Sequence, residues 1–132
     1  MILLDTHVFY WWLGEPSNLS QTAREWIDRC EAGKCVVCIP VIALWELESK
    51  RRTGKLVLRC PLRDAWPTLA AIKGVEWLTP SVDDWLLAAE LVWGHRDPAD
   101  RLIAAIALNR GVAVLTKDRA FHQADSPVQA LW

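Results

Sequence analysis

The chain has 132 residues, a length typical of one domain, and 52% of them are hydrophobic, which is enough for a core without disulfides or a structural metal. The formal net charge of −1 excludes a polycation, so any nucleic-acid binding must come from a local basic patch. The N-terminus lacks the pattern of a signal peptide, and no apolar stretch has the length of a membrane span. We therefore expect one cytoplasmic domain over residues 1–132 with no membrane association.

Short apolar runs alternate with segments that have helical periodicity and recognisable ends. Ser20 and Ser81 are favourable N-cap residues, and Pro40 fits the first turn of a helix. The predicted elements are a strand at 2–4, helices at 6–13 and 21–31, a strand at 35–39, a helix at 40–52, a weaker helical region at 60–74, a strand at 75–78, helices at 82–92 and 98–110, a strand at 112–115 and an edge strand at 128–131. This alternation predicts an α/β fold, a three-layer α/β/α sandwich around a mainly parallel sheet.

Cys35 and Cys38 have the Cys-x-x-Cys spacing of a zinc or redox pair. They lie in the apolar run at 35–39, however, and residues three apart on a strand point to opposite faces. We therefore expect free thiols that behave as small hydrophobic residues.

Nine tryptophans are many for a chain of this size. Tryptophan buries a large apolar area, so we expect most of them in the core. Trp11 and Trp12 are neighbours on a predicted helix and cannot share one face, so one of them is expected to point outward.

Four acidic residues lie where the predicted elements should meet at one edge of the sheet. Asp5 directly follows the first strand, and Asp118 lies just past the strand at 112–115. Asp100 is in the first turn of a helix, and Glu46 is in the helix after the second strand. Functional crevices in open parallel sheets lie beyond the carboxyl ends of the strands, so these carboxylates are expected to converge.

Each of these acids also has a purely structural interpretation. Asp5 could form a turn, Asp118 could be a solvated loop residue, and Asp100 could stabilise the start of its helix. Helical periodicity does not distinguish Glu46 from Glu48, since either could face the edge of the core. The pattern alone therefore predicts an acidic edge without naming its reaction.

Converged carboxylates repel one another and are costly to desolvate unless a cation joins them. Mg²⁺ suits such oxygen ligands because it binds a few carboxylates and keeps several waters, and Mn²⁺ can substitute. In phosphodiester cleavage these metals activate water and stabilise the leaving oxygen, so no Ser, Cys or His nucleophile is needed. A metal-assisted site is the chemistry that this edge favours.

Four segments carry a resemblance to a known family. They are Leu3-Leu4-Asp5-Thr6-His7, then Leu44-Trp45-Glu46 with Lys50 and Gly54-Lys55-Leu56, then His95-Arg96-Asp97-Pro98-Ala99-Asp100-Arg101-Leu102-Ile103-Ala104-Ala105, and finally Leu115-Thr116-Lys117-Asp118. Together they resemble the PIN-domain family, specifically the VapC-type ribonuclease toxins of bacterial type II toxin–antitoxin systems. The segments occur in the family's order and span nearly the whole chain.

The resemblance implies a single PIN-like domain that hydrolyses RNA with Mg²⁺. It selects Glu46 over Glu48, and Asp100 over Asp97, as a metal ligand. The residues that it implies as both catalytic and metal-binding are Asp5, Glu46, Asp100 and Asp118. Thr6, Thr116 and Asp97 are implied in supporting roles, the threonines through hydrogen bonds to the acids or to a metal-bound water, and Asp97 mainly as a helix cap.

The resemblance also implies two protein partners, a cognate antitoxin and a second copy of the chain in a homodimer. An apolar antitoxin segment would lie in a groove, for which Trp11, Trp12 and the region around Trp66 are candidates. Neither interface is located by the sequence.

A basic run next to Glu46 is the candidate surface for the RNA substrate. The residues expected to contact RNA are Lys50, Arg51, Arg52, Lys55 and, beside the third acid, Arg101; Arg59 and Arg63 extend the run. Lys and Arg are also favoured at the carbonyl end of a solvated helix, and Arg101 could instead pair with the acids. None of the three histidines is expected to be catalytic, and His95 is expected in a loop or cap.

An acidic edge is also compatible with other classes of protein. A dehalogenase-type phosphatase would need a second Asp two positions after Asp5, where His7 stands, and a receiver domain does not account for Glu46. A non-catalytic RNA- or protein-binding module that retains an acidic edge would bind RNA without cleaving it.

Overall fold

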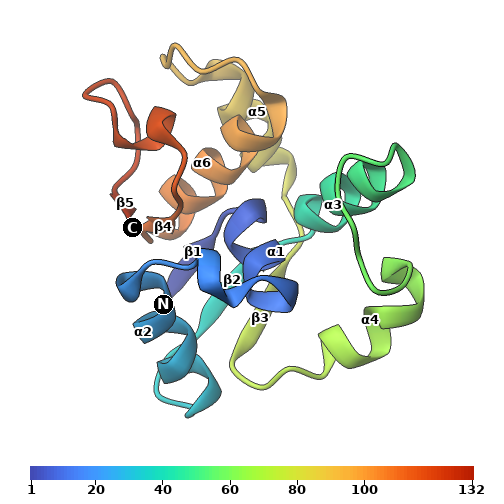
Figure 1. Ribbon diagram of the computed structural model, residues 1–132. Coiled ribbons are helices and arrows are strands. Elements are labelled where there is room, and N and C mark those ends of the chain that lie inside the picture. The colour runs from blue at the N-terminus through green and yellow to red at the C-terminus, as the bar shows by residue number, and fades with distance from the viewer.

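The computed structural model describes residues 1–132 and has a five-stranded sheet between two layers of helices (Figure 1). All neighbouring strands are parallel, in the order β3-β2-β1-β4-β5. The strands are β1 (Ile2–Leu4), β2 (Val37–Pro40), β3 (Val75–Leu78), β4 (Val114–Leu115) and β5 (Ala130–Leu131). The predicted three-layer α/β/α fold is confirmed.

Six α-helices and two short 3₁₀ helices connect and cover the strands. They are α1 (Thr6–Gly14), η1 (Pro16–Asn18), α2 (Gln21–Glu31), α3 (Ile42–Arg52), α4 (Leu62–Ala70), α5 (Val82–Glu90), α6 (Pro98–Arg110) and η2 (Arg119–His122). Ser20 and Ser81 cap α2 and α5 with their side chains, as predicted. No helix is both long enough and apolar enough to cross a lipid bilayer.

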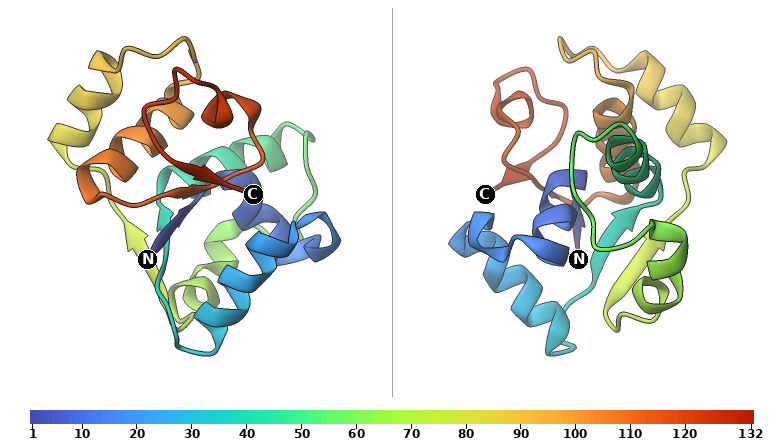
Figure 2. Two further views of the ribbon diagram at one scale, coloured as in Figure 1. Left: turned by 90° about the vertical axis from the view of Figure 1, so that its left-hand side faces the viewer. Right: turned by 45° about the vertical axis from the view of Figure 1, so that its right-hand side comes forward.

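The sheet separates two hydrophobic cores because alternate strand residues point to opposite faces. Ile2 and Leu4 of β1 contribute to the core that α1 to α4 help to form, whereas Leu3 contributes to the core under α5 and α6. Figure 2 shows α5 and α6 on one side of the sheet and α1, α2 and α4 on the other. Burial on both faces explains why the strand sequences read as continuous apolar runs.

The register of β1 against β4 fixes the position of the functional edge. Leu4 pairs with Leu115, and the backbone N–H of Asp5 donates to the carbonyl of Leu115 at 3.1 Å. Asp5 and Thr116 therefore emerge together from the carboxyl ends of two adjacent strands.

Several predicted boundaries differ from the structure, most clearly the one at Pro40. Pro40 is the last residue of β2, where it pairs with Leu78, and α3 begins at Ile42. The weaker helical region predicted at 60–74 forms α4 with Pro67 inside it, and the buried side chains of Leu62 and Leu69 hold this helix on the core.

The thiols behave as expected, but the tryptophans do not. Cys35 packs against the first core and Cys38 lies in the second, and both are free. Of the nine tryptophans, Trp93 alone is buried. Trp45, Trp66 and Trp85 are among the exposed large hydrophobic residues, so most tryptophans lie at the surface or at the border of the core, contrary to expectation.

Candidate active site

Asp5 is buried at the carboxyl end of β1, with an exposed fraction of 2%. It precedes α1 but does not cap that helix with its side chain. The hydroxyl of Thr116 donates a hydrogen bond to Asp5 Oδ2 at 2.7 Å, and His7 Nδ1 lies 3.9 Å from the same oxygen. Burial raises the pKa of Asp5 above its ordinary value despite the hydrogen bond from Thr116. The fold thus places the Asp5 carboxyl in a buried position, where its ionised form is costly in free energy.

Glu46 reaches the same edge from α3. The hydroxyl of Thr6, in the first turn of α1, donates to Glu46 Oε2 at 2.5 Å. Lys50 Nζ lies 3.9 Å from Glu46 Oε1. Burial raises the pKa of Glu46, and the negative charge of Asp5 contributes in the same direction. The charge of Asp5 therefore affects the protonation of Glu46.

Asp100 lies in the first turn of α6, where Asp97 caps the helix by accepting from the N–H groups of Ala99 and Asp100 at 2.9 and 3.2 Å. Asp100 Oδ2 lies 2.5 Å from His95 Nε2. Burial raises the pKa of Asp100 to about 7, although His95 opposes this, and the charges of Asp5 and Asp97 contribute to the rise.

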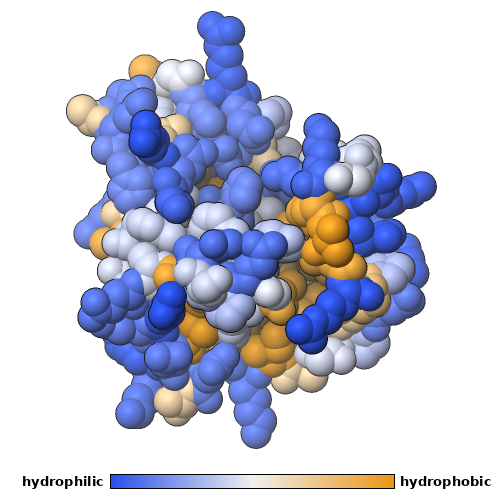
Figure 3. Space-filling model, viewed as in Figure 1, coloured by the Kyte–Doolittle hydropathy of each residue, from blue (hydrophilic) through white to orange (hydrophobic).

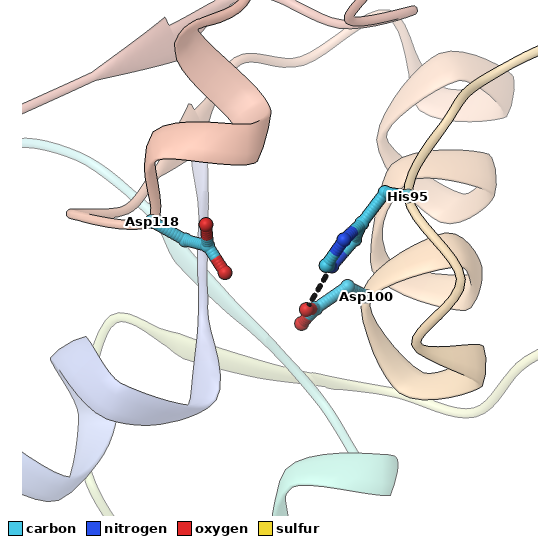
Figure 4. Close-up of side chains that lie close together, drawn as sticks. All are labelled: His95, Asp100 and Asp118. Carbon is cyan, nitrogen blue, oxygen red and sulfur yellow. Dashed lines mark hydrogen bonds and ion pairs between the residues drawn. The ribbon is translucent and has the colours of Figure 1, made fainter.

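Asp118 completes the group from the loop after β4. Its N–H donates to Thr116 Oγ1 at 3.0 Å, and its Oδ1 accepts from the N–H of Ala120 at 2.8 Å, which caps η2. One ligand atom from each of His95, Asp100 and Asp118 lies within 4.8 Å of the others (Figure 4). Asp118 is therefore not an isolated loop acid.

The four acids that the sequence singled out are thus brought to one edge by β1, α3, α6 and the loop after β4. The threonines named as supporting residues contact two of these acids directly. Asp97 caps α6, as expected, and its charge contributes to the raised pKa of Glu46 and of Asp100.

His95 is the site residue that sequence reasoning missed. It lies in the loop before α6, as expected, and the segment that resembles the PIN-domain family begins with it, but no periodicity or ligand spacing indicates a role at the site. Its position two residues before the helix cap Asp97 was the available indication, because a residue there lies at the same edge as the first turn of α6.

The donor set fits a hard divalent cation. It consists of carboxylate oxygens and one imidazole nitrogen, and three of the four carboxyls are buried enough for their pKa values to rise. A cation at the centre would favour the ionised forms that burial disfavours. Mg²⁺ and Mn²⁺ are the ions that prefer such oxygen-rich ligands.

In the basic run beside the site, some side chains pair with carboxylates and others do not. Lys50 lies near Glu46, and Arg51 makes two hydrogen bonds to Glu48, at 2.6 and 3.0 Å. Arg52 and Lys55 are exposed and make no ion pair. They are the members of the predicted set that are free to contact a phosphate.

Arg101 has a different environment from the one expected for an RNA contact. Its guanidinium donates to the backbone carbonyls of Ala88, Trp93, His95 and Leu91 at 2.7 to 3.1 Å. It makes no ion pair with the acids. These bonds join α6 to the end of α5 and to the segment between the two helices, so they give Arg101 a structural role, while its contact with RNA stays a prediction.

Comparison with known proteins shows where this arrangement belongs. The family model described as "PIN domain" matches residues 2–127. The chain is 33% identical over 129 residues to "Ribonuclease VapC22" of Mycobacterium tuberculosis (strain ATCC 25618 / H37Rv), covering 96% of this chain and 95% of that protein.

Solved structures share the fold at lower sequence identity. A chain of VapBC2 from Rickettsia felis, bound to a DNA fragment from its promoter, aligns with a TM-score of 0.69, 15% identity and coverage of 99% of this chain and 98% of that chain. A chain of DNA-bound VapBC from Salmonella typhimurium aligns with a TM-score of 0.68, 21% identity and coverage of 98% and 96%. The family model, the curated relative and the fold agree, and the chain belongs to the PIN-domain family.

Proposed function

We propose that this protein is a divalent-metal-dependent ribonuclease that hydrolyses RNA phosphodiester bonds, and that it is the toxin of a toxin–antitoxin pair. The observation that carries the proposal is the convergence of Asp5, Glu46, Asp100 and Asp118 at the carboxyl edge of a parallel sheet. The 33% identity to a ribonuclease supports the choice of RNA as substrate.

In this proposal Asp5, Asp100 and Asp118 hold Mg²⁺ or Mn²⁺, and Glu46 completes the site directly or through water. When bound, such a metal activates a water molecule and stabilises the leaving oxygen. The role of Thr116 is to orient the carboxylate of Asp5, since its hydroxyl donates to Oδ2.

Two further side chains orient acids in this proposal. Thr6 orients Glu46, and His95 orients Asp100, each through a contact of 2.5 Å. These contacts fix the direction of the acids before substrate arrives, which is the arrangement that metal-assisted catalysis requires.

RNA would be held by cations around the acidic centre. Arg52 and Lys55 are exposed on the α3 side, and Lys50 and Arg51 extend the same surface. Contacts to phosphates by these residues would make RNA affinity fall steeply with salt concentration.

An antitoxin segment is proposed to occupy the apolar groove between α1 and α4. The groove encloses about 510 Å³ and is lined mainly by apolar side chains, among them Leu13, Leu58, Ala65 and Leu69. Figure 3 shows an apolar area in this region, over α1 and the chain after α3. The structural relatives are toxin–antitoxin complexes, which supports such an occupant. Trp66 lies on α4 but does not line this groove, and neither do Trp11 and Trp12.

A homodimer and a cytoplasmic location, which the resemblance and the sequence imply, stay part of this proposal. Sedimentation of the purified protein would test the dimer. A mass of one chain at micromolar concentration would contradict it.

The function is tested by incubating the purified protein with total cellular RNA in the presence of Mg²⁺ or EDTA, beside the Asp5→Asn variant. We expect cleavage by the wild type with Mg²⁺, and none with EDTA or with the variant. Cleavage by Asp5→Asn at the wild-type rate would refute the proposed site. RNA binding without cleavage under all conditions would indicate the non-catalytic alternative.

A further inference from the structure

A surface hollow of about 540 Å³ lies between α3 and α4. Trp45, Glu48, Ser49 and Arg52 line it from α3, at the spacing of one helical face. The side that α4 provides includes Arg63 and Trp66. Glu46, one of the four acids, is the residue next to Trp45, so the hollow and the proposed active site lie on adjoining faces of α3.

The two tryptophans of the hollow present their rings to solvent. Trp45 is 66% exposed and Trp66 is 39% exposed. The ring of Trp66 packs edge to face against Trp77, with centroids 5.0 Å apart. Trp77 is itself fixed, because its Nε1 donates to the carbonyl of Leu69 at 3.4 Å. A ring fixed in this way loses little conformational freedom when a ligand stacks on it.

The charge of the hollow is positive. Arg52 and Arg63 are exposed, and neither guanidinium is in an ion pair. The carboxylate of Glu48 is already satisfied, because it accepts two hydrogen bonds from Arg51 and one from the N–H of Leu62 at 3.1 Å. An anionic ligand would therefore meet two free cations and no free carboxylate among the lining residues.

We propose that this hollow binds an unpaired base of a single-stranded RNA substrate, with the base against the indoles of Trp45 and Trp66 and the adjoining phosphates at Arg52 and Arg63. The inference rests on the ribonuclease function proposed above and names the form of RNA that this site takes. Exposed aromatic rings bind any base that is out of a duplex, whereas the bases of a double helix are already stacked on one another. The base would then lie on the face of α3 that adjoins the face carrying Glu46.

A protein segment suits this hollow less well than a nucleotide does. The groove on the α1 side of α4 is lined mainly by apolar side chains, as a peptide helix requires, whereas half of the residues that line this hollow are polar or charged and two of them carry unpaired guanidinium groups. Unpaired cations beside aromatic rings match the phosphates and bases of a nucleic acid.

The test measures binding of a fluorescein-labelled uridine octanucleotide by fluorescence anisotropy, with the Asp5→Asn chain as the background so that cleavage does not interfere. Trp45→Ala should weaken binding at least about fivefold, while Trp45→Phe should stay within about threefold of the background chain because it keeps an aromatic face. Trp85→Ala is the matched control, since Trp85 is 51% exposed on α5 and lies outside the hollow. Arg63→Ala should lower the slope of log affinity against log salt by about one.

Unchanged affinity in Trp45→Ala would overturn the proposal. Equal loss in Trp45→Ala and Trp85→Ala would also overturn it, because the effect would then not be specific to the hollow. Loss of antitoxin binding by Trp45→Ala with RNA affinity intact would show a protein interface instead. If the wild type fails to cleave RNA but the octanucleotide binding still depends on Trp45, the ribonuclease is refuted and the RNA-binding hollow is supported.

Discussion

Thr116 connects Asp5 to Asp118, two acids that are 113 positions apart in the sequence, through a single hydroxyl group. Its Oγ1 donates to Asp5 Oδ2 at 2.7 Å and accepts from the N–H of Asp118 at 3.0 Å. Thr116 is fully buried. The hydroxyl therefore fixes the carboxylate at the end of β1 relative to the loop that follows β4.

Replacing Thr116 by valine should impair both activity and folding. The variant keeps the shape but leaves the Asp5 carboxylate without this donor, and an unmet buried acceptor costs about 1 to 3 kcal/mol in free energy of unfolding. We expect RNA cleavage to fall about tenfold or more, with weaker binding of Mn²⁺ measured by calorimetry. Thr116→Ser keeps the hydroxyl and should retain most of both. Wild-type cleavage by Thr116→Val would show that the hydroxyl does not position Asp5.

The raised pKa of Asp100 predicts how stability depends on pH without metal. The folded protein holds this proton up to a pKa of about 7, whereas the unfolded chain releases it near the ordinary value of 3.8. The folded state binds more protons between these values, so the free energy of unfolding should fall as the pH rises from about 4 to 7. Asp100→Asn has no proton to release there, and urea unfolding in EDTA should show a flatter profile and, at pH 8, greater stability than the wild type.

Adding Mg²⁺ separates this effect from a general change in stability. A bound cation stabilises the folded state by mass action and favours ionised carboxylates, so the melting temperature of the wild type should rise at pH 8. Asp100→Asn lacks a proposed ligand and should respond less. Equal shifts in both proteins would argue against Asp100 as a ligand.

The sequence predicted which edge would carry the acids, but not how they contact one another. Asp5 and Asp118 follow strands, and parallel strands end at one edge, so their convergence needed only the element order. That Thr116 reaches Asp5 depends on β1 and β4 being neighbours, and strand order in the sheet has no local sequence pattern.

Glu46 and Glu48 show the limit of helical periodicity. Both fit one helix, and the choice depends on what packs beside α3. The structure places Thr6 against Glu46, and it places Arg51 and the N–H of Leu62 against Glu48. The resemblance to the PIN-domain family selected Glu46, because the family's motifs reflect tertiary contacts of this kind. The periodicity of a single helix does not contain them.

The apolar groove gives a prediction about the antitoxin. Thr68 is exposed on α4 and lines the groove, so Thr68→Arg would place a charged side chain in the proposed binding surface without disturbing the core. We expect antitoxin binding, measured by calorimetry, to weaken at least about tenfold while RNA cleavage stays unchanged. Thr68→Ser is the control. Normal binding by Thr68→Arg would place the antitoxin elsewhere.

Arg101 tests the distinction between a structural cation and an RNA contact. Its guanidinium donates to several backbone carbonyls from the end of α5 to the segment before α6, including that of His95 at 2.9 Å. Arg101→Gln cannot satisfy them all, so the free energy of unfolding should fall by about 2 to 3 kcal/mol, measured by urea denaturation.

Arg96→Gln is the matched control for Arg101→Gln, because Arg96 is exposed, lies in the segment to which Arg101 is hydrogen-bonded, and has no ion pair. It should change stability by less than about 0.5 kcal/mol. A direct RNA contact would produce the opposite pattern for Arg101→Gln: unchanged unfolding, weaker RNA binding and a smaller dependence of affinity on salt. The hydrogen bonds of Arg101 indicate a structural role. The rate of RNA cleavage by Arg101→Gln should therefore fall only as far as the fraction of molecules that are folded and keep the His95–Asp100 contact.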